Sequence, residues 1–174
     1  MSDTAILVID VQIGVVQGSL RAARLDSVLD NLNLAIAMAR QRGYPVIVIQ
    51  HEEDGLEADS ADWQLHPALA VTDSDIRIRK CYGDSFCDTG LAAVLKQHGI
   101  RTLWVGGCAT DFCVDSTVRN AVSHGYQVSI ISDAHTTVSA FALSGEQVID
   151  HFNAVWRATR ATPQPLRVVP ASQL

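Results

Sequence analysis

Several motifs and segment types are missing from this sequence of 174 residues, and each absence argues against a class of protein. No apolar run reaches the roughly 18 residues that a membrane-spanning helix needs. The nucleotide-binding patterns G-x-G-x-x-G and G-x-x-x-x-G-K-[ST] do not occur, and neither does the serine-hydrolase pattern G-x-S-x-G. Aromatic residues make up 6% of the chain, which is too few for a base-stacking platform. We therefore expect no membrane association and no nucleotide-binding loop.

Positive charge is scarce, and lysine is the scarcer of the two strongly basic residues. The chain has 13 Lys+Arg against 19 Asp+Glu, which gives a formal net charge of −6. Nucleic-acid binding requires clustered positive charge, so we expect no nucleic-acid partner. Lys80 and Lys96 are the only lysines. A coding bias towards arginine explains this composition, yet a lysine kept against such a bias is a candidate for chemistry that needs a compact ammonium group.

The N-terminus and the cysteines both indicate a reducing compartment. The first residues are acidic and lack the basic region and the cleavage site of a signal peptide, so we expect a cytoplasmic protein. The four cysteines stand at 81, 87, 108 and 113, and their spacings are unusual for zinc sites. In an unsecreted chain of this size we expect free thiols, and neither a metal nor a cofactor.

The hydrophobic pattern predicts an α/β fold. Hydrophobic residues are 48% of the chain and charged residues 18%, which favours one well-packed domain over residues 1–174. Short apolar runs predict six strands at 4–9, 45–50, 75–79, 101–106, 127–132 and 166–169. Helical periodicity falls between them at 25–40, 90–98, 112–124 and 144–157, with Thr89 and Asp111 as possible caps of the second and third helices. This alternation predicts a parallel sheet with helices on both faces, a three-layer α/β/α architecture.

Chemically useful side chains follow several of these strands. Ligands of parallel sheets bind outside the carboxyl ends of the strands. Asp10 follows the first strand, His51 the second, Lys80 the third, and Asp133 the fifth, while the turn after the fourth leads to Cys113. Each has a structural alternative, since Asp10 could serve as a turn former and His51 as a hydrogen-bonded core residue. Their convergence on one edge nevertheless favours a catalytic site.

Cys113 is the better of two candidate nucleophiles. It falls in the first turn of the expected helix, where backbone N–H groups favour a thiolate and could hold an oxyanion. A nearby Lys80 is expected to lower the pKa of the thiol further, and Asp10 could take its proton. Cys108 lies before the turn and is less well placed. Pairing of Cys108 with Cys113, or of Cys81 with Cys87, in a redox protein stays open, as does a scaffold without activity.

These motifs together resemble the isochorismatase-like cysteine hydrolases, a family that includes isochorismatases, nicotinamidases and N-carbamoylsarcosine amidase. The resemblance covers about residues 4 to 155. Its most specific block runs from Gly107 to Val114, with weaker matches at 5–12, 80–91 and 132–134. It implies strand order 3-2-1-4-5-6 and a homo-oligomer, dimeric or larger. It also implies catalytic roles for Asp10, Lys80 and Cys113.

The resemblance further implies a cis peptide between Cys108 and Ala109 and an oxyanion hole formed by the amides of Ala109 and Cys113. Nicotinamidases carry an Asp-x-His metal motif after the second strand, but Ile49 stands here in place of the Asp. We therefore expect a hydrolase of a small amide, a carbamoyl compound or a related C–N substrate that works through a thioester. Isochorismatase or nicotinamidase activity is the alternative. The expected substrate pocket consists of Val11, Gln12, His51, Trp63, Tyr82, Phe86 and Phe112.

Overall fold

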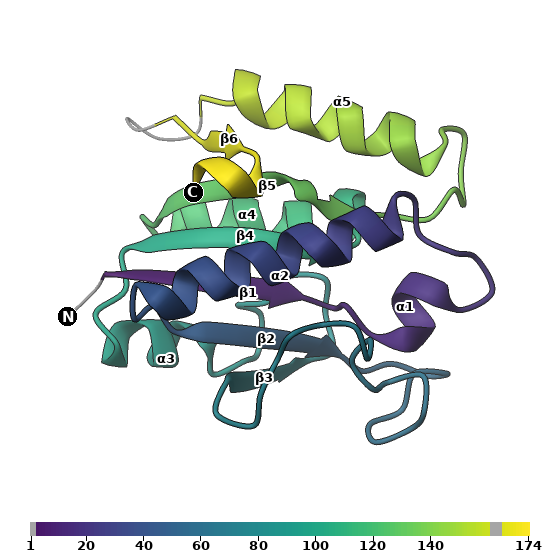
Figure 1. Cartoon of the computed structure of the whole chain (residues 1–174), viewed down its shortest axis with the longest axis horizontal. Helices are drawn as coiled ribbons and strands as arrows, with labels where there is room; N and C mark the ends of the chain where they lie inside the picture. The colour runs from purple at the N-terminus through teal and green to yellow at the C-terminus, as the bar shows by residue number, and fades with distance from the viewer. Residues whose placement is uncertain (1–2, 161–164) are drawn as a thin grey trace.

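The computed structural model describes residues 3–160 and 165–174; positions 1–2 and 161–164 of the expected 1–174 domain lie outside the described residues. The elements follow one another as β1 (Thr4–Ile9), α1 (Ile13–Gln17), α2 (Leu25–Gln41), β2 (Val46–His51), β3 (Ile76–Lys80), α3 (Leu91–Gln97), β4 (Thr102–Cys108), the π-helical turn η1 (Thr110–Val114), α4 (Asp115–Ser123), β5 (Gln127–Thr136), α5 (Gly145–Ala158), β6 (Arg167–Val169) and the 3₁₀ turn η2 (Ala171–Gln173). Figure 1 shows their arrangement. Within the described residues, no helix is both long and apolar enough to cross a membrane.

A single six-stranded parallel sheet organises the chain. Its order is β3-β2-β1-β4-β5-β6, which confirms the predicted architecture and strand order. Every residue of β1, the strand between β2 and β4, is buried. This burial explains why β1 is a continuous apolar run without alternation, since helices cover both of its faces.

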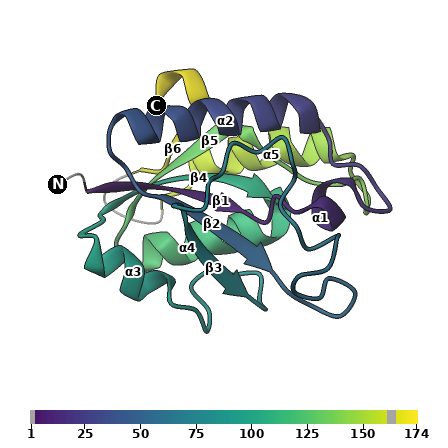
Figure 2. The same cartoon turned by 60° about the horizontal axis from the view of Figure 1, so that its bottom comes forward.

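Helices cover the two faces with separate hydrophobic cores. One core joins β1 side chains such as Ile6 and Val8 to α2 and to Trp104. The other joins Leu7 and Ile9 to α3, α4 and Trp156 of α5. Figure 2 shows α2 along one face of the sheet and α3 and α4 along the other. The alternation of side chains along β1 thus divides its residues between the two cores.

Some boundaries differ from the sequence-based expectations. The helix expected at 112–124 is divided into η1 and α4, and neither has a side-chain cap, so the cap expected at Asp111 is wrong. Strand β5 continues to Thr136, which places Asp133 inside the strand, where its Oδ1 accepts a hydrogen bond from the Ala171 amide at 2.9 Å. The expected position of Asp133 at the active edge is therefore wrong. The short helix α1 was not predicted, because five residues are too few to show a periodicity.

The carboxyl edge of the central strands depends on an unusually close backbone approach. Gly107 of β4 has a φ of +128°, and a Cβ there would lie 2.0 Å from the Ile9 carbonyl oxygen. Only glycine therefore lets β4 pass β1 at this point. Asp10, the residue after Ile9 of β1, has a φ of +49° and is fully buried. This approach brings the Asp10 carboxylate beside the turn that carries Cys113.

Candidate active site

Three elements bring Asp10, Lys80 and Cys113 together at the carboxyl edge of the sheet. Asp10 follows β1, Lys80 ends β3 and Cys113 lies in η1. The Lys80 ammonium is 2.6 Å from the Asp10 carboxylate, and both side chains are fully buried. The same ammonium donates to the Cys113 Sγ at 3.3 Å. Lys80 reaches Asp10 across β2, which lies between their strands, so a long side chain is required.

The third neighbour of the ammonium is His51, and this contact determines the state of the imidazole. Lys80 Nζ lies 3.2 Å from His51 Nδ1. An ammonium group has three hydrogens and no acceptor, so Nδ1 must accept. The proton of the neutral ring is then on Nε2, which is 3.4 Å from the Glu53 carboxylate. The Lys80 ammonium thus forms an ion pair with a carboxylate and hydrogen bonds with an imidazole and a thiol.

Burial controls the protonation of Asp10 and Cys113. It raises the pKa of Asp10 above its ordinary value, and the Lys80 ammonium opposes that change. Burial, reinforced by the Asp10 charge, raises the pKa of the Cys113 thiol to about 12, although Lys80 acts in the opposite direction. The predicted lowering of the thiol pKa is therefore wrong. The loss of solvation at this buried site outweighs the attraction of the ammonium.

The arrangement favours an internal transfer of the proton over its release to solvent. A thiolate beside an ionised Asp10 and a single Lys80 would leave a buried net negative charge. Transfer of the proton from Sγ to Asp10 instead leaves a thiolate, an ammonium and a neutral acid, so the net charge of the cluster does not change. The raised pKa of Asp10 makes it a better proton acceptor. The cluster can therefore produce a thiolate at the moment of reaction.

The backbone before Cys113 has an uncommon geometry. The Cys108–Ala109 peptide bond is cis. The Ala109 carbonyl oxygen accepts hydrogen bonds from the amides of Phe112 at 3.1 Å and Val114 at 3.0 Å, which form the π-helical turn. Across residues 3–160 and 165–174, no backbone acceptor binds the Ala109 amide. That N–H is available for an oxyanion, the role that the resemblance implies for it together with the Cys113 amide.

A buried network behind the turn was missed by the sequence analysis. Thr110 Oγ1 lies 2.9 Å from His135 Nδ1, and His135 Nε2 lies 3.2 Å from Asn153 Oδ1. Asn153 uses its amide group to donate to the Ser132 carbonyl at 2.9 Å, so its Oδ1 must accept from His135. His135 Nδ1 then accepts from the Thr110 hydroxyl. Burial lowers the pKa of His135 to about 4, so the ring is neutral at pH 7.

The residues of the expected substrate pocket have different surroundings in the structure. Gln12 is fully buried; its Nε2 donates to the carbonyls of His51 and Trp63 at 3.0 Å each, and its Oε1 accepts from the His51 amide at 2.7 Å. It therefore ties β1 and β2 to the loop that carries Trp63, whose ring packs against the Arg79 guanidinium at 4.9 Å. Tyr82 is 55% exposed and Phe112 50% exposed.

Two of the expected pocket residues belong to the core. Val11 is buried in the cluster beneath α2. Phe86 is buried and stacks on His124 and Tyr126, with ring centroids 5.0 and 5.9 Å apart. Tyr126 directly precedes β5, so Phe86 lies towards the amino end of that strand and away from Cys113. The assignment of these two side chains to the pocket wall is therefore corrected.

The other three cysteines differ in burial, since Cys81 and Cys87 are exposed and Cys108 is buried. All four cysteines are free thiols in the structure. Cys108 is buried in the core beneath α2, and burial raises its pKa well above the ordinary value.

Ile49, at the position of the nicotinamidase Asp, is fully buried in β2. Among the described residues, no group of three or more His, Cys, Asp or Glu side chains is arranged to hold a metal ion.

Comparisons with known proteins agree with this geometry. The model of the isochorismatase domain matches residues 4–160. Streptothricin hydrolase of Streptomyces noursei is 34% identical over 136 residues, which cover 76% of this chain and 49% of that protein. The uncharacterized isochorismatase family protein YecD of Escherichia coli O157:H7 is 33% identical over 156 residues, with 79% of this chain and 81% of that protein covered.

The similarity extends to a solved structure. A crystal structure of an isochorismatase family protein matches with a TM-score of 0.89 at 34% identity, covering 97% of this chain and 99% of that one. The chain spans about half the length of the streptothricin hydrolase that it resembles, but nearly all of this structural neighbour. Since the domain model matches most of the chain, this protein belongs to the isochorismatase family.

Proposed function

We propose that this protein hydrolyses the C–N bond of a small amide, a carbamoyl compound or a related substrate through a thioester on Cys113. The observation that carries the proposal is the buried Lys80 ammonium, which contacts both the Asp10 carboxylate at 2.6 Å and the Cys113 Sγ at 3.3 Å. A scaffold protein has no need for a buried charged pair at a thiol, because burying charges opposes folding. The name of the related streptothricin hydrolase is in keeping with hydrolysis.

The proposed reaction has two halves. Asp10 takes the proton of Cys113, and the sulfur attacks the substrate carbonyl carbon. The amides of Ala109 and Cys113 hold the oxyanion, and the protonated Asp10 gives its proton to the nitrogen as the C–N bond breaks. A water molecule then loses a proton to Asp10 and attacks the thioester. The acid leaves, and the proton returns to the thiol.

Lys80 has an electrostatic role in this proposal. Its ammonium balances the single negative charge that moves between Asp10 and Cys113 during each half of the reaction. His51 Nδ1 contacts the ammonium at 3.2 Å, and His51 Nε2 lies 3.4 Å from the Glu53 carboxylate. A positive charge fixed in a buried site stabilises the thiolate more strongly than it would in water.

Two measurements test the proposal. A panel of small amides and carbamoyl compounds is screened for ammonia release, and an electrophilic amide analogue is used to label the protein. We expect ammonia release, with label on Cys113 in the wild type and in Cys108→Ala, and no label in Cys113→Ala. Labelling that persists in Cys113→Ala and disappears in Cys108→Ala would show that Cys108 is the nucleophile and would contradict the proposal.

The same experiments separate the alternatives. Turnover of nicotinamide would favour a nicotinamidase, and release of pyruvate from isochorismate would favour an isochorismatase. A reversible disulfide under mild oxidation, without any hydrolysis, would indicate a thiol redox protein. Our further predictions of a cytoplasmic location and of a dimer or larger homo-oligomer are checked by cell fractionation and by light scattering after size-exclusion chromatography.

A further inference from the structure

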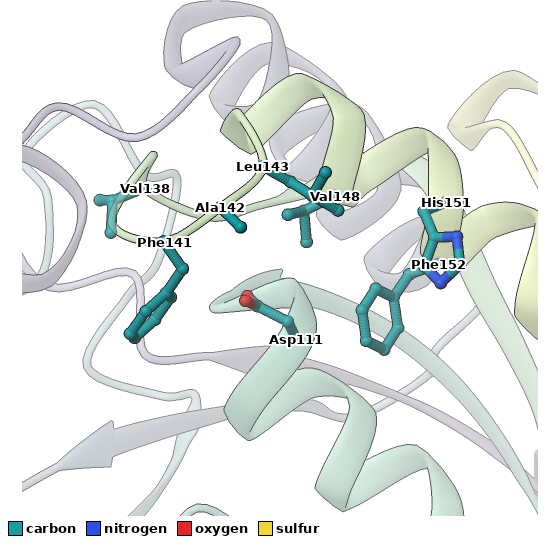
Figure 3. Close-up of a pocket in the computed structure, with 8 residues that line it drawn as sticks. All are labelled: Asp111, Val138, Phe141, Ala142, Leu143, Val148, His151 and Phe152. Carbon is teal, nitrogen blue, oxygen red and sulfur yellow. The ribbon is translucent and has the colours of Figure 1, made fainter.

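A pocket of about 330 Å³ lies beside the nucleophile turn and is not used by the proposed mechanism. It is bounded by η1, by the segment that joins β5 to α5, and by α5 itself. Figure 3 shows Phe141 on one side, Phe152 on the other and Val148 above, with the Asp111 carboxylate directed into the space between them. The volume is within the range of small-molecule sites and suits one ring with a short side chain.

Asp111 is turned away from the catalytic thiol. Side chains two residues apart in a helical turn do not face each other, so Asp111 and Cys113 point in different directions from η1. The Asp111 Oδ1 accepts a hydrogen bond from the Thr137 hydroxyl at 2.7 Å, which holds the carboxylate at the pocket. In the described part of the chain, no Lys, Arg or His forms an ion pair with Asp111.

The other walls are apolar or aromatic, with the His151 imidazole beside Phe152 as the one further polar side chain among the lining residues. Phe141 is 74% exposed, and its ring centroid lies 5.9 Å from that of Phe112. Phe152 packs edge-to-face with His151 at 5.7 Å. Asp111 is thus the only acidic side chain among the residues that line the pocket. The half-buried carboxylate has the Thr137 hydroxyl as a partner but no cation, so a ligand that covers it has to replace the water that it loses.

This combination selects ligands by charge. A carboxylate attracts an ammonium group, and the faces of aromatic rings stabilise a cation in the same place. An anion would be repelled by Asp111, and a neutral apolar ligand would bury the carboxylate without a partner. We propose that the pocket beside η1 binds an apolar organic cation, such as an arylalkylammonium group, with the ammonium on Asp111 and the apolar part between Phe141 and Phe152.

The cation has two possible sources. It is either a charged end of the substrate or a separate small molecule that binds behind the nucleophile turn. The first source depends on the proposed hydrolase function, whereas binding itself does not. Binding is therefore measured without catalysis, in Cys113→Ala protein, so that failure of the pocket and failure of the proposed function remain distinguishable.

The binding test compares three probes of similar size. Phenethylammonium, 2-phenylethanol and 3-phenylpropionate are titrated separately and followed by calorimetry or by NMR shifts. We expect phenethylammonium to bind at least about tenfold more tightly than the alcohol, a difference of about 1.4 kcal/mol. The propionate is expected to bind most weakly. Equal affinities for the cation and the alcohol would overturn the proposal.

Two substitutions and one control assign the binding to this pocket. In Asp111→Asn the carbonyl oxygen can still accept from Thr137, but the charge is lost, so the preference for the cation should disappear. Phe141→Ala should weaken all three probes. Asp73→Asn removes an exposed carboxylate elsewhere and should leave the affinities unchanged. A cation preference that survives in Asp111→Asn would show that the site is wrong.

Activity measurements then distinguish the two sources. If the cation is part of the substrate, Asp111→Asn raises the KM of ammonium-bearing amides and not that of neutral amides. If it is a separate ligand, phenethylammonium changes the kcat or KM of a neutral amide in the wild type and not in Asp111→Asn. Binding that affects neither measurement would reduce the pocket to a surface cavity and contradict a role for it.

Discussion

At the scale of single residues, the compact shape of the Lys80 ammonium lets one nitrogen atom contact three side chains at once. Its nitrogen lies 2.6 Å from the Asp10 carboxylate, 3.2 Å from His51 Nδ1 and 3.3 Å from Cys113 Sγ. These three acceptors surround a single nitrogen atom in a fully buried position. An arginine presents a flat and larger fork of donors, which cannot converge on three acceptors around one point. The rarity of lysine in the sequence is consistent with this need.

We predict that Lys80→Arg folds and loses turnover by about 10²- to 10⁴-fold, the usual range for the loss of a positioned acid–base group. The guanidinium keeps a positive charge near Asp10 but displaces the thiol. The measurement is ammonia release with the best amide of the panel, together with a thermal melt. Lys96→Arg is the matched control, because Lys96 lies at the exposed end of α3. Wild-type activity in Lys80→Arg would contradict the assignment.

Replacement of Lys80 by an uncharged residue affects folding instead. Lys80→Met leaves the buried Asp10 carboxylate without its cation. We predict a loss of about 3–5 kcal/mol in the free energy of unfolding, as is found when one partner of a buried ion pair is removed. The double variant Lys80→Met/Asp10→Asn should recover part of that loss. Denaturant unfolding curves measure both, and equal stabilities of the two variants would argue against a charged pair.

His135 gives a prediction for the pH dependence of stability. Its pKa falls from 6.5 in the unfolded chain to about 4 in the folded protein, so the unfolded state binds the proton first on acidification. Stability should therefore fall as the pH decreases from 6.5 to 4, by about 3 kcal/mol at 1.36 kcal/mol per pH unit. His135→Gln should remove this part of the slope when unfolding is measured across the same range. Identical slopes in the two proteins would contradict a buried neutral imidazole.

At the scale of elements, the turn that carries Cys113 depends on how closely β4 approaches β1. Gly107 has no Cβ that could collide with the Ile9 carbonyl, and β4 continues from there through the cis peptide into η1. The Thr110–His135–Asn153 network then fixes this turn to β5 and α5 at 2.9 and 3.2 Å. The position of Cys113 is therefore set by contacts with three other elements and not by η1 alone.

Two glycine substitutions should separate a required glycine from a tolerant one. Gly107→Ala would place its Cβ 2.0 Å from a backbone oxygen, and we predict a loss of about 3 kcal/mol or more in stability. Gly90→Ala has no atom within 4 Å of the new Cβ and no positive φ. Here we predict either no change or a gain of about 0.4–1 kcal/mol. Thermal melts of both variants provide the measurement, and a mild effect at Gly107 would contradict the close approach.

At the scale of the whole molecule, one sheet separates two cores, and strands β1, β2, β4 and β5 contribute side chains to both. Trp104 lies in the core beneath α2, and Trp156 lies in the opposite core with α3 and α4. Strands β1 and β4 contribute alternate side chains to both cores. Loss of packing on one face therefore removes the support of the other, and the chain should unfold as one unit.

Trp104 and Trp156 allow that expectation to be tested once the third tryptophan, Trp63, is replaced. In Trp63→Phe/Trp104→Phe the fluorescence comes from Trp156, and in Trp63→Phe/Trp156→Phe it comes from Trp104. We predict that each variant unfolds with the same midpoint by fluorescence and by far-ultraviolet circular dichroism, because both probes follow one transition. Separate midpoints for the two probes within either variant would indicate independent units and contradict a single domain over residues 1–174.

Local patterns in the sequence were sufficient for much of the architecture. The runs that formed β1, β2 and β4 were recognisable because buried parallel strands are continuously apolar. The helix expected at 144–157 was recognisable from its periodicity, and the structure adds a capping box of Ser144 and Gln147 at its start. The carboxyl-edge rule placed Asp10, His51 and Lys80 on one side. These features depend on residues that are close together in the chain, so they can be predicted from a single sequence.

Other features depended on distant neighbours. The raised pKa of Cys113, about 12, reflects how deeply the thiol is buried beside Asp10, which no local pattern encodes. Phe86 looked like a pocket residue but packs on His124 and Tyr126. The apolar residues around Phe141 line the pocket beside η1, which the sequence analysis did not predict. The sequence by itself determined which side chains were available and which strands would bury them. Only the tertiary structure decided their contacts, because charge, burial and pocket shape depend on residues brought together from separate elements.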